Sequence, residues 1–244
     1  MIVIVLGMHR SGTSTVAGIL HLNKISMGTY QSFWPRPLPQ NPKGFYENFD
    51  FRKINDLIMK NVHYQIKSYN PDIPTAKINQ KLENKMIKVI NKYESDFEFW
   101  GWKDPRTCLT ISHWINCLDA LNLRKKIKII YITRKSSSVA RSLKKRNNLP
   151  LNQGLMLWKS YSEIAVSVCE KNDIPVLYMS FEQILNSPAN HFGVMFKFLD
   201  RPFSSSIIDD FVDKKISKSG DGEELELPIE VANLERKIEK LIST

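Results

Sequence analysis

Short apolar runs alternate with amphipathic segments along most of this chain. Residues 2–6 are all apolar, and similar runs recur at 97–102, 127–132 and 175–179, which is typical of buried strands. Apolar positions at helical spacing predict helices in the ranges 15–22, 51–58, 79–95, 107–118, 136–143, 151–171, 185–199 and 229–242. Strands that alternate with helices indicate an α/β fold, in which helices cover both faces of a central parallel sheet.

Two segments interrupt this pattern. Residues 28–46 hold four prolines and two glycines, and a loop of this length is typical of a lid or a binding loop. Residues 213–224 are rich in Lys, Ser, Gly and Asp, and a helical pattern with one apolar face follows at 229–242. We find no repeat and no linker, so we expect residues 1–244 to form one domain that ends in this basic loop and amphipathic helix.

Composition narrows the class of protein and of partner. The chain has 244 residues and a formal net charge of +10, which favours an anionic ligand. Helix-turn-helix spacing, zinc-ligand clusters and aromatic RNA-binding motifs are missing, so we expect no nucleic-acid partner. Three widely spaced cysteines fit neither a disulfide framework nor a metal site and favour a reducing compartment. Without a signal-peptide pattern or an apolar run long enough to span a bilayer, we expect a cytoplasmic protein.

A glycine-containing loop follows the first apolar run and carries the strongest functional signal. Residues 7–14 read Gly-Met-His-Arg-Ser-Gly-Thr-Ser, which nearly fits the phosphate-binding pattern G-x-x-x-x-G-K-[ST]. The backbone N–H groups of such a loop, together with the start of the next helix, favour a bound anion. Thr13 stands at the lysine position and Arg10 supplies the cation instead. An ordinary turn between strand and helix is the alternative interpretation.

Basic residues follow two more of the predicted strands. Lys103 and Arg106 follow the strand at 97–102, and Arg134 follows the strand at 127–132. Parallel strands place their carboxyl ends at one edge of the sheet, where ligands bind. We therefore expect these cations to meet Arg10 around a polyanionic ligand. An acidic residue that would help to hold magnesium is missing after the third run, which favours a site without a metal.

These motifs resemble those of sulfotransferases that use 3′-phosphoadenosine 5′-phosphosulfate (PAPS). Residues 10–14 are similar to the 5′-phosphosulfate loop of that family, and Arg134 with Ser142 eight residues later resembles its 3′-phosphate motif. A third, degenerate segment at 177–199 is similar to the family's Tyr-Glu-Asp-Leu…Pro…Phe-Leu segment, while the C-terminal Arg-Lys-Gly signature of the animal cytosolic branch is missing. The resemblance thus points to the bacterial, Golgi-type and protein-tyrosine branches. It implies a P-loop-like three-layer fold and a nucleotide site made of Arg10, Ser11, Gly12, Thr13, Ser14, Arg134 and Ser142.

Candidate catalytic residues come from the same positions. Arg10 and Lys103 would stabilise charge on the sulfuryl group and on the leaving oxygen, and Lys103 lies in a segment that resembles one with a catalytic lysine in the protein-tyrosine branch. Glu47, flanked by aromatic residues after the proline-rich loop, is our candidate for the general base. The alternative interpretation is an acidic residue that favours the start of a helix, and Asp50, His63 and His113 are the other candidates for the base.

Two residues are candidates for binding the acceptor. Arg106 would hold acceptor or sulfuryl oxygens, although a surface ion pair with Asp104 is equally consistent with the sequence. Trp34 would stack on a sugar or an aromatic acceptor, or else anchor the loop that contains it.

The sequence therefore predicts transfer of a sulfuryl group from PAPS to a hydroxyl, or an amine, of a small-molecule or glycan acceptor. A P-loop kinase or nucleotide triphosphatase is the alternative enzyme class, and magnesium dependence would distinguish it. A protein that binds the nucleotide without catalysis is the third class.

Overall fold

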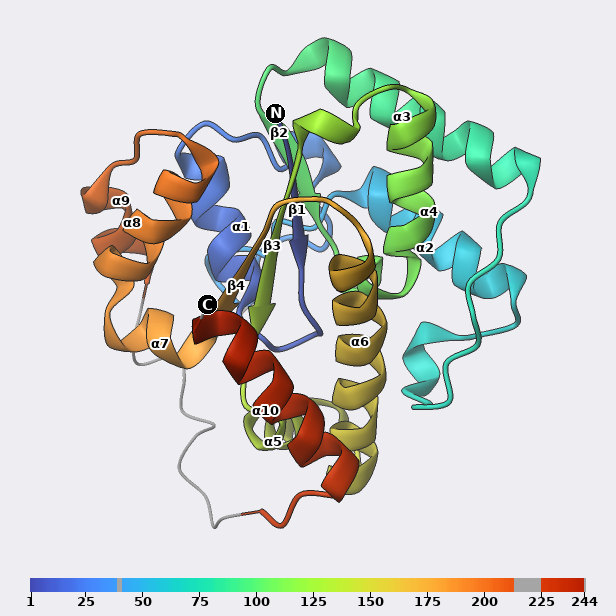
Figure 1. Ribbon diagram of the computed structural model, residues 1–244, viewed down its shortest axis with the longest axis vertical. Coiled ribbons are helices and arrows are strands. Elements are labelled where there is room, and N and C mark those ends of the chain that lie inside the picture. The colour runs from blue at the N-terminus through green and yellow to red at the C-terminus, as the bar shows by residue number, and fades with distance from the viewer. Residues whose placement is uncertain (39–40, 213–224, 244) are drawn as a thin grey trace.

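A four-stranded parallel sheet forms the centre of the molecule. The structure is a computed structural model that describes residues 1–38, 41–212 and 225–243. The strands are β1 (Ile2–Leu6), β2 (Trp100–Lys103), β3 (Ile127–Thr133) and β4 (Val176–Ser180), and their order in the sheet is β2-β1-β3-β4 (Figure 1). All neighbouring strands are parallel, so the sheet predicted from the apolar runs is confirmed.

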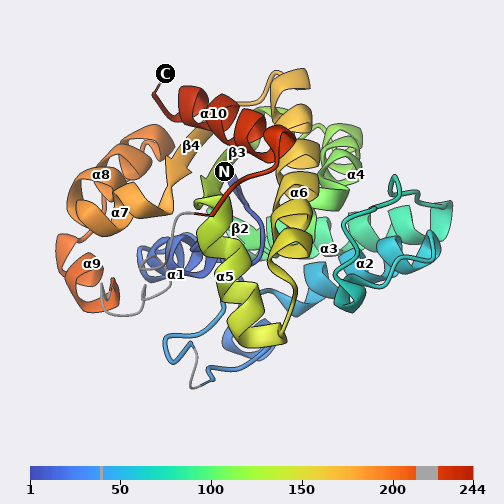
Figure 2. The same ribbon diagram turned by 90° about the horizontal axis from the view of Figure 1, so that it is seen from below.

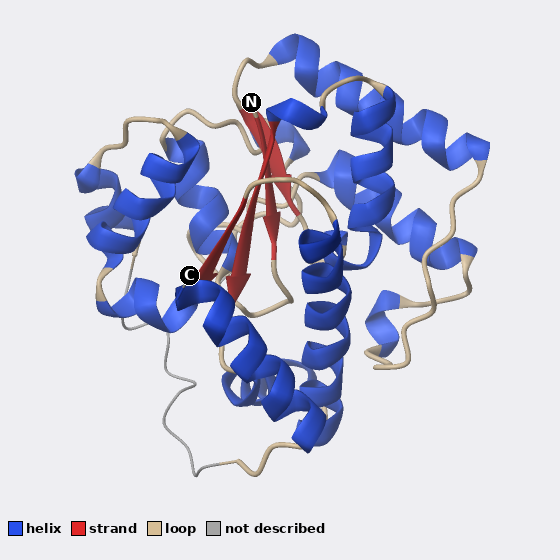
Figure 3. Cartoon of the chain, viewed as in Figure 1, coloured by secondary structure: helices blue, strands red, loops and turns tan. Residues whose placement is uncertain are grey.

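Helices occupy most of the remaining chain (Figure 3). The α-helices are α1 (Thr13–Leu22), α2 (Phe49–Asn61), α3 (Gln80–Asp96), α4 (Thr107–Ala120), α5 (Ser136–Asn147), α6 (Leu151–Lys171), α7 (Phe181–Asn186), α8 (Pro188–Leu199), α9 (Ser205–Phe211) and α10 (Ile229–Ser243). Three short 3-10 helices are η1 (Tyr30–Ser32), η2 (Ile66–Ser68) and η3 (Arg124–Lys126).

Alternating side chains of β1 supply both faces of the sheet. Ile2, Ile4 and Leu6 belong to one buried cluster, together with residues of α2, α3, α4, α5, α6 and α10. Val3 and Val5 belong to a second buried cluster on the other face, with residues of α1, α8 and α9. Figure 2 shows these two groups of helices on opposite sides of the strands. The expected three-layer α/β arrangement is confirmed, because a sheet with two apolar faces must be covered on both.

The pairing register brings the functional strand ends together. Val5 of β1 pairs with Lys103 of β2 on one side and with Ile130 of β3 on the other. The next residues after these strands therefore emerge at the same edge of the sheet, the edge toward which the arrows of Figure 1 point. Thr133, the last residue of β3, pairs with Ser180 of β4 at this edge.

Several element boundaries differ from those that the sequence predicts. α1 begins at Thr13 rather than at residue 15, because Gly12 has a φ of 86° and ends the loop directly before it. β2 begins only at Trp100, since the N–H of Phe97 still bonds to the carbonyl of Tyr93 at the end of α3. The helical pattern at 185–199 divides before Pro188 into the end of α7 and the whole of α8, and α9 was not predicted at all.

Three further predictions concern the buried tryptophans and cysteines, the basic loop and the C-terminal helix. Trp100 and Trp102 are fully buried core residues, and all three cysteines are free and buried. The proposed basic loop at 213–224 lies outside the described residues. α10, which follows it, packs against α6 and β4 through Val231 and Ile238. Among the described helices, none is long and apolar enough to cross a bilayer.

Candidate functional site

The loop between β1 and α1 has the backbone geometry of an anion-binding turn. Gly7, Arg10 and Gly12 all have positive φ values, of 148°, 73° and 86°. A side chain at Gly12 would collide with the ring of Phe181, because a Cβ there would lie 2.1 Å from a ring carbon. No side chain caps α1, so the N–H groups of its first turn point toward the loop without a capping partner. Glycine is therefore required where β4, α7 and the loop approach each other.

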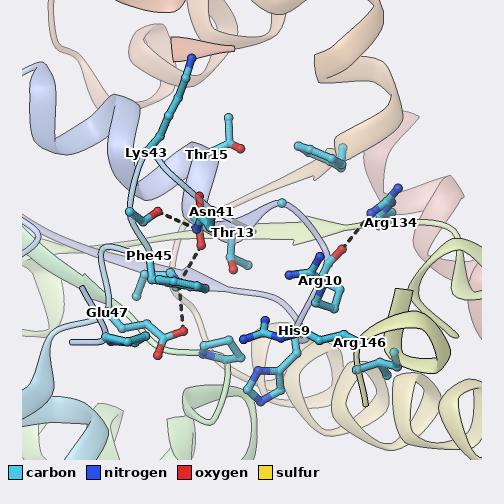
Figure 4. Close-up of a pocket in the computed structure, with 18 of the residues that line it drawn as sticks. His9, Arg10, Thr13, Thr15, Asn41, Lys43, Phe45, Glu47, Arg134 and Arg146 are labelled. Carbon is cyan, nitrogen blue, oxygen red and sulfur yellow. Dashed lines mark hydrogen bonds and ion pairs between the residues drawn. The ribbon is translucent and has the colours of Figure 1, made fainter. Parts of the chain in front are cut away.

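The two nucleotide motifs predicted from the sequence touch each other. Nε of Arg10 donates a hydrogen bond of 2.8 Å to Oγ of Ser142 on α5, a residue 132 positions away. Arg134 donates from its guanidinium to the carbonyl oxygen of Arg10 at 3.3 Å (Figure 4). Burial lowers the pKa of the Arg10 guanidinium, and the nearby charges of Arg146 and Arg134 lower it further. Several cations thus converge on one loop, which favours an anion between them.

Arg134 is held in place from several directions. Its Nε lies 3.9 Å from a carboxylate oxygen of Glu182, and its guanidinium carbon lies 5.5 Å from the centre of the Phe181 ring. The indole N–H of Trp158 donates to its carbonyl oxygen at 3.1 Å. These contacts fix the side chain at the carboxyl end of β3, where the sequence placed it.

Lys103 connects the loop to the candidate base. Its Nζ lies 3.2 Å from Oγ of Ser14 and 3.2 Å from Oε1 of Glu47, and the side chain is almost completely buried. Burial lowers the pKa of Lys103, although the carboxylate of Glu47 opposes that change. The other oxygen of Glu47 lies 3.7 Å from Arg52 and 3.9 Å from Arg106. Glu47 therefore sits among three cations at the end of β2.

Arg106 forms the ion pair with Asp104 that the sequence suggested as an alternative. The pair is buried, however, and does not lie on the surface. Its guanidinium lies 2.7 Å from carboxylate oxygens of both Asp104 and Asp56. Burial opposes the charged form, but the charges of Asp104 and Asp56 raise the pKa of Arg106 above its usual value. Asp104 and Asp56 thus hold Arg106 beside Glu47.

Asn55 is a site residue that the sequence analysis missed. Its side-chain N–H group donates to Asp104 at 2.8 Å and to Thr107 at 3.0 Å, and its oxygen accepts from Thr110 and Trp114. Asn55 is completely buried on α2, next to Ile54. The sequence feature that could have identified Asn55 is an amide at a core-facing position of an amphipathic helix, because a buried polar group requires hydrogen-bond partners.

The ring of His9, a residue of the loop between β1 and α1, borders the site. The residue is half-buried, its Nε2 is shielded from solvent, and the ring packs edge-on against Tyr161 with ring centres 5.8 Å apart. Burial lowers the pKa of His9 to about 3, and the charge of Arg106 acts in the same direction. We therefore expect a neutral imidazole at this position near pH 7.

These groups surround a cavity of about 340 Å³ at the carboxyl edge of the sheet (Figure 4). Eight basic side chains and a single carboxylate, that of Glu47, are among the described residues that line it. The basic residues are Arg10, Lys43, Arg52, Lys67, Lys103, Arg106, Arg134 and Arg146. Their convergence agrees with the expectation that cations from three strand ends meet at one edge. Within the described ranges, no group of three or more His, Cys, Asp or Glu side chains is placed to hold a metal ion.

The predicted site residues divide into those that line the cavity and those that do not. Gly12, Thr13 and Ser14 line it beside the predicted basic residues, whereas Ser11 and Ser142 are buried just outside its lining. Trp34 does not line it, and about half of its surface is exposed; its neighbour Pro35 contributes instead. The expected stacking role of Trp34 therefore has no support from its position.

The three rivals of Glu47 lie away from this cavity. Asp50 binds Lys92 at 2.9 Å and Tyr93 at 3.1 Å on the surface of α2 and α3. His113 lies 3.0 Å from the carbonyl oxygen of Ala76, and His63 borders a separate shallow depression. Asn48, rather than an acidic residue, caps α2 by accepting from the N–H of Asp50. Among the four candidates only Glu47 therefore reaches the cavity.

Several lining residues were not singled out from the sequence. Lys43 comes from the proline-rich loop, Lys67 and Tyr69 come from the segment around η2, and Arg146 comes from the end of α5. They belong to loops and helix ends without a motif. The proline-rich loop itself offered a signal, because its length is typical of binding loops.

Comparisons with known proteins identify the family. A model of the sulfotransferase domain matches residues 2–220. Among solved structures, the sulfotransferase domain from the curacin biosynthetic pathway is similar with a TM-score of 0.62 and 13% identity, over 97% of this chain and 96% of that chain. The sulfotransferase domain from the Synechococcus PCC 7002 olefin synthase gives a TM-score of 0.63 and 13% identity, over 98% and 94%.

At this identity the two structures show a shared fold alone. No curated protein sequence matches the chain significantly. The family model, in contrast, covers most of the chain, including the loop after β1, Lys103, Arg134 and Ser142. The chain therefore belongs to the sulfotransferase family.

Proposed function

We propose that this protein transfers a sulfuryl group from PAPS to a hydroxyl group, or an amine, of a small-molecule or glycan acceptor. Membership of the sulfotransferase family supports a transferase, while the donor, the acceptor and the residue roles are our proposal. The observation that carries it is the contact between Arg10 and Ser142 beside Arg134. The contact joins the loop that would bind the 5′-phosphosulfate to the pair that would bind the 3′-phosphate.

The residues present fit a phosphorylated nucleotide. Oγ of Ser11 is buried and has no hydrogen-bond partner among the described residues, and such a polar group is costly unless a ligand satisfies it. Gly12 leaves no room for a side chain beside Phe181, so the loop can keep its N–H groups facing the cavity. Arg10, Thr13 and Ser14 would hold the 5′ side, and Arg134 and Ser142 would hold the 3′-phosphate.

Sulfuryl transfer requires that charge be stabilised where bonds change. The donor supplies an activated sulfuryl group: the acceptor oxygen forms the new S–O bond while the S–O bond to the 5′-phosphate breaks. Arg10 and Lys103 direct N–H groups toward the site where negative charge develops, and such preorganised donors lower the barrier. The electrostatic logic is that of phosphoryl transfer, in which positioning and charge dominate.

Glu47 would accept the proton of the acceptor. Its carboxylate lines the cavity, and Lys103 holds one of its oxygens at 3.2 Å. Arg106, which Asp104 and Asp56 fix in place, would position acceptor or sulfuryl oxygens beside it. The neutral His9 ring lines the same cavity and adds no charge to it near pH 7. We assign no metal ion to this reaction.

We also propose that residues 1–244 act as one domain and that the protein works in the cytoplasm. Free, buried Cys108, Cys117 and Cys169 fit a reducing compartment. The family model extends across residues 2–220, and α10 packs onto α6 and β4 of the same body.

Calorimetric titration with nucleotides tests the donor assignment. Wild-type protein should bind 3′-phosphoadenosine 5′-phosphate (PAP) more tightly than adenosine 5′-phosphate. Arg134→Ala should remove about 1.5–3 kcal/mol of that preference, the typical contribution of a charged hydrogen bond. Lys144→Ala is the control, because Lys144 is exposed on α5, the helix that follows Arg134, and does not line the cavity.

Turnover separates this proposal from its rivals. Release of PAP from PAPS should exceed any release of phosphate from ATP or GTP in the presence of magnesium. Equal affinity for the two adenosine nucleotides would contradict the proposed donor. Hydrolysis of ATP without use of PAPS would indicate a phosphotransferase, and nucleotide binding without turnover of any donor would indicate a binding protein.

A further inference from the structure

The basic side chains that line the cavity outnumber the carboxylates that lie close enough to pair with them. Arg52 and Lys103 lie near Glu47, Arg106 lies against Asp104 and Asp56, and Arg134 lies near Glu182. Lys67 and Arg146 differ from these residues. Within the part of the chain that the structure describes, neither has a carboxylate at ion-pair distance, although both line the cavity. A pair of cations at the mouth of a binding site favours an anionic ligand group.

Lys67 and Arg146 lie on one connected edge of the cavity, which we call the acceptor rim: residues Ile66, Lys67, Tyr69, Arg146 and Asn147. The side-chain N–H group of Asn147 donates to the hydroxyl of Tyr69 at 3.0 Å, and Gln153 donates to the carbonyl oxygen of Tyr69 at 2.9 Å. These bonds join the segment around η2 to the end of α5 and to the start of α6. The rim is therefore a built edge in which two distant segments are fixed together.

The rim faces the side of the cavity that holds the candidate base. The guanidinium of Arg146 lies over the ring of Phe45, 5.9 Å from its centre, and Phe45 is two residues before Glu47. Arg146 is also ten residues beyond Ser136 on α5, which is about 15 Å along the helix axis. Figure 4 shows Arg146 and Arg134 at different places on the same side of the cavity. Ser142 lies one turn before Arg146, so the rim begins beside the proposed nucleotide pair and extends from there toward Phe45 and the segment around η2.

We propose that the acceptor rim binds an anionic group, such as a carboxylate or a sulfate, on the acceptor molecule itself. The acceptor class is therefore a hydroxyl compound that also carries a negative charge, and this assignment rests on the proposed sulfuryl transfer. A guanidinium pairs with such a group through two parallel hydrogen bonds, and Lys67 adds a second charge. The aromatic rings of Phe45 and Tyr69 provide flat surfaces for the rest of the acceptor.

Isosteric acceptor pairs test this assignment. The probes are 4-hydroxybenzoate with 4-hydroxybenzamide, and glucuronate with glucuronamide, because the members of each pair differ chiefly in charge. With PAPS as donor, the carboxylate of at least one pair should show a kcat/KM roughly 10-fold or more above its amide, as a charged hydrogen bond implies. The double variant Lys67→Gln/Arg146→Gln should bring that ratio close to one and leave the affinity for PAP unchanged.

A control variant and a binding measurement decide the remaining outcomes. Lys144→Gln/Lys145→Gln removes two exposed charges from α5 that do not line the cavity, so the preference should persist in it. In thermal-shift measurements on the PAP complex, the preferred carboxylate should raise the melting temperature more than its amide does. Equal use and equal binding of acid and amide in both pairs, or a preference that survives in Lys67→Gln/Arg146→Gln, would overturn the assignment.

Two other results would point elsewhere. A fall in PAP affinity in Lys67→Gln/Arg146→Gln, as large as the fall in acceptor use, would assign the rim to the nucleotide and overturn the proposal. Failure of the wild-type protein to bind PAP would overturn the proposed donor instead. Thermal shifts of the nucleotide-free protein with the acid and amide probes would then decide whether the rim prefers an anion.

Discussion

Lys103 and Glu47 form a buried ion pair of 3.2 Å that joins the end of β2 to the proline-rich loop. The same Lys103 nitrogen also lies 3.2 Å from Ser14 at the start of α1. One ammonium group therefore contacts both the loop that would hold the donor and the carboxylate that would deprotonate the acceptor. Breaking a buried pair leaves the other charge uncompensated, so substitutions here must be nearly isosteric to be informative.

Glu47→Gln should fold and bind PAP, yet lose about 10²–10⁴-fold in the rate of sulfuryl transfer. The amide keeps a hydrogen-bond acceptor for Lys103 but cannot take up a proton. Rates and PAP affinity are measured side by side, with Asp50→Asn as the matched control because Asp50 lies outside the cavity. Near-normal turnover in Glu47→Gln would limit Glu47 to positioning Lys103.

Arg10→Ala should slow turnover by about 10²–10³-fold, the typical effect of removing one donor to a developing negative charge. Its effect on PAP affinity should be smaller, because that charge develops only in the transition state. Single-turnover rates and titration with PAP provide the comparison. Ser142→Ala removes the 2.8 Å partner of Arg10 and should reproduce part of the loss. A loss of PAP binding with an unchanged rate at saturation would contradict this role.

Glu235 of α10 should position α5, although it lies beyond the residues that the family model matches. Its carboxylate accepts a hydrogen bond of 2.7 Å from the N–H of Ser136, two residues after Arg134. We expect Glu235→Ala to reduce stability by about 1 kcal/mol, as the loss of a helix cap does, and to weaken PAP binding.

Glu235→Gln keeps an acceptor oxygen and should restore most of the PAP affinity. Glu239→Ala, one turn further along α10 and exposed, should change neither property. Unfolding by denaturant and calorimetric titration measure the two effects. Unchanged PAP affinity in Glu235→Ala would limit Glu235 to a stabilising contact.

His9 should make the protein less stable as the pH falls from about 6.5 toward about 3. Its pKa is lowered on folding, so in this interval the unfolded chain binds a proton that the folded protein does not. Stability therefore rises with pH across the interval, by up to about 1.4 kcal/mol per pH unit from this group. His9→Gln should show a shallower dependence of unfolding free energy on pH. His191→Gln provides the comparison with another histidine, and identical slopes in His9→Gln and wild type would refute the prediction.

Much of the fold could be predicted because local patterns record burial. The continuous apolar run at residues 2–6 is required by a strand buried on both faces, so it indicates both the strand and the layers around it. Gly7 and Gly12 mark the sharp loop, since only backbone without a side chain fits there. Parallel strands then imply that Lys103 and Arg134 share an edge with Arg10, and the structure brings them to one cavity.

The tertiary structure alone decided which of the other side chains reach that cavity. Trp34 is about half exposed and lies outside the cavity lining, while Arg146 and Tyr69 line the site. The paths of the proline-rich loop and of the segment around η2 depend on packing rather than on local periodicity. Asn55 looked like one polar residue on a helix until Asp104, Thr110 and Trp114 converged on it. A sequence pattern indicates whether a residue favours burial, exposure to water or a particular backbone φ. Contacts between residues that are far apart in the sequence form only when helices and loops pack together, because each contact depends on the position and angle of both elements.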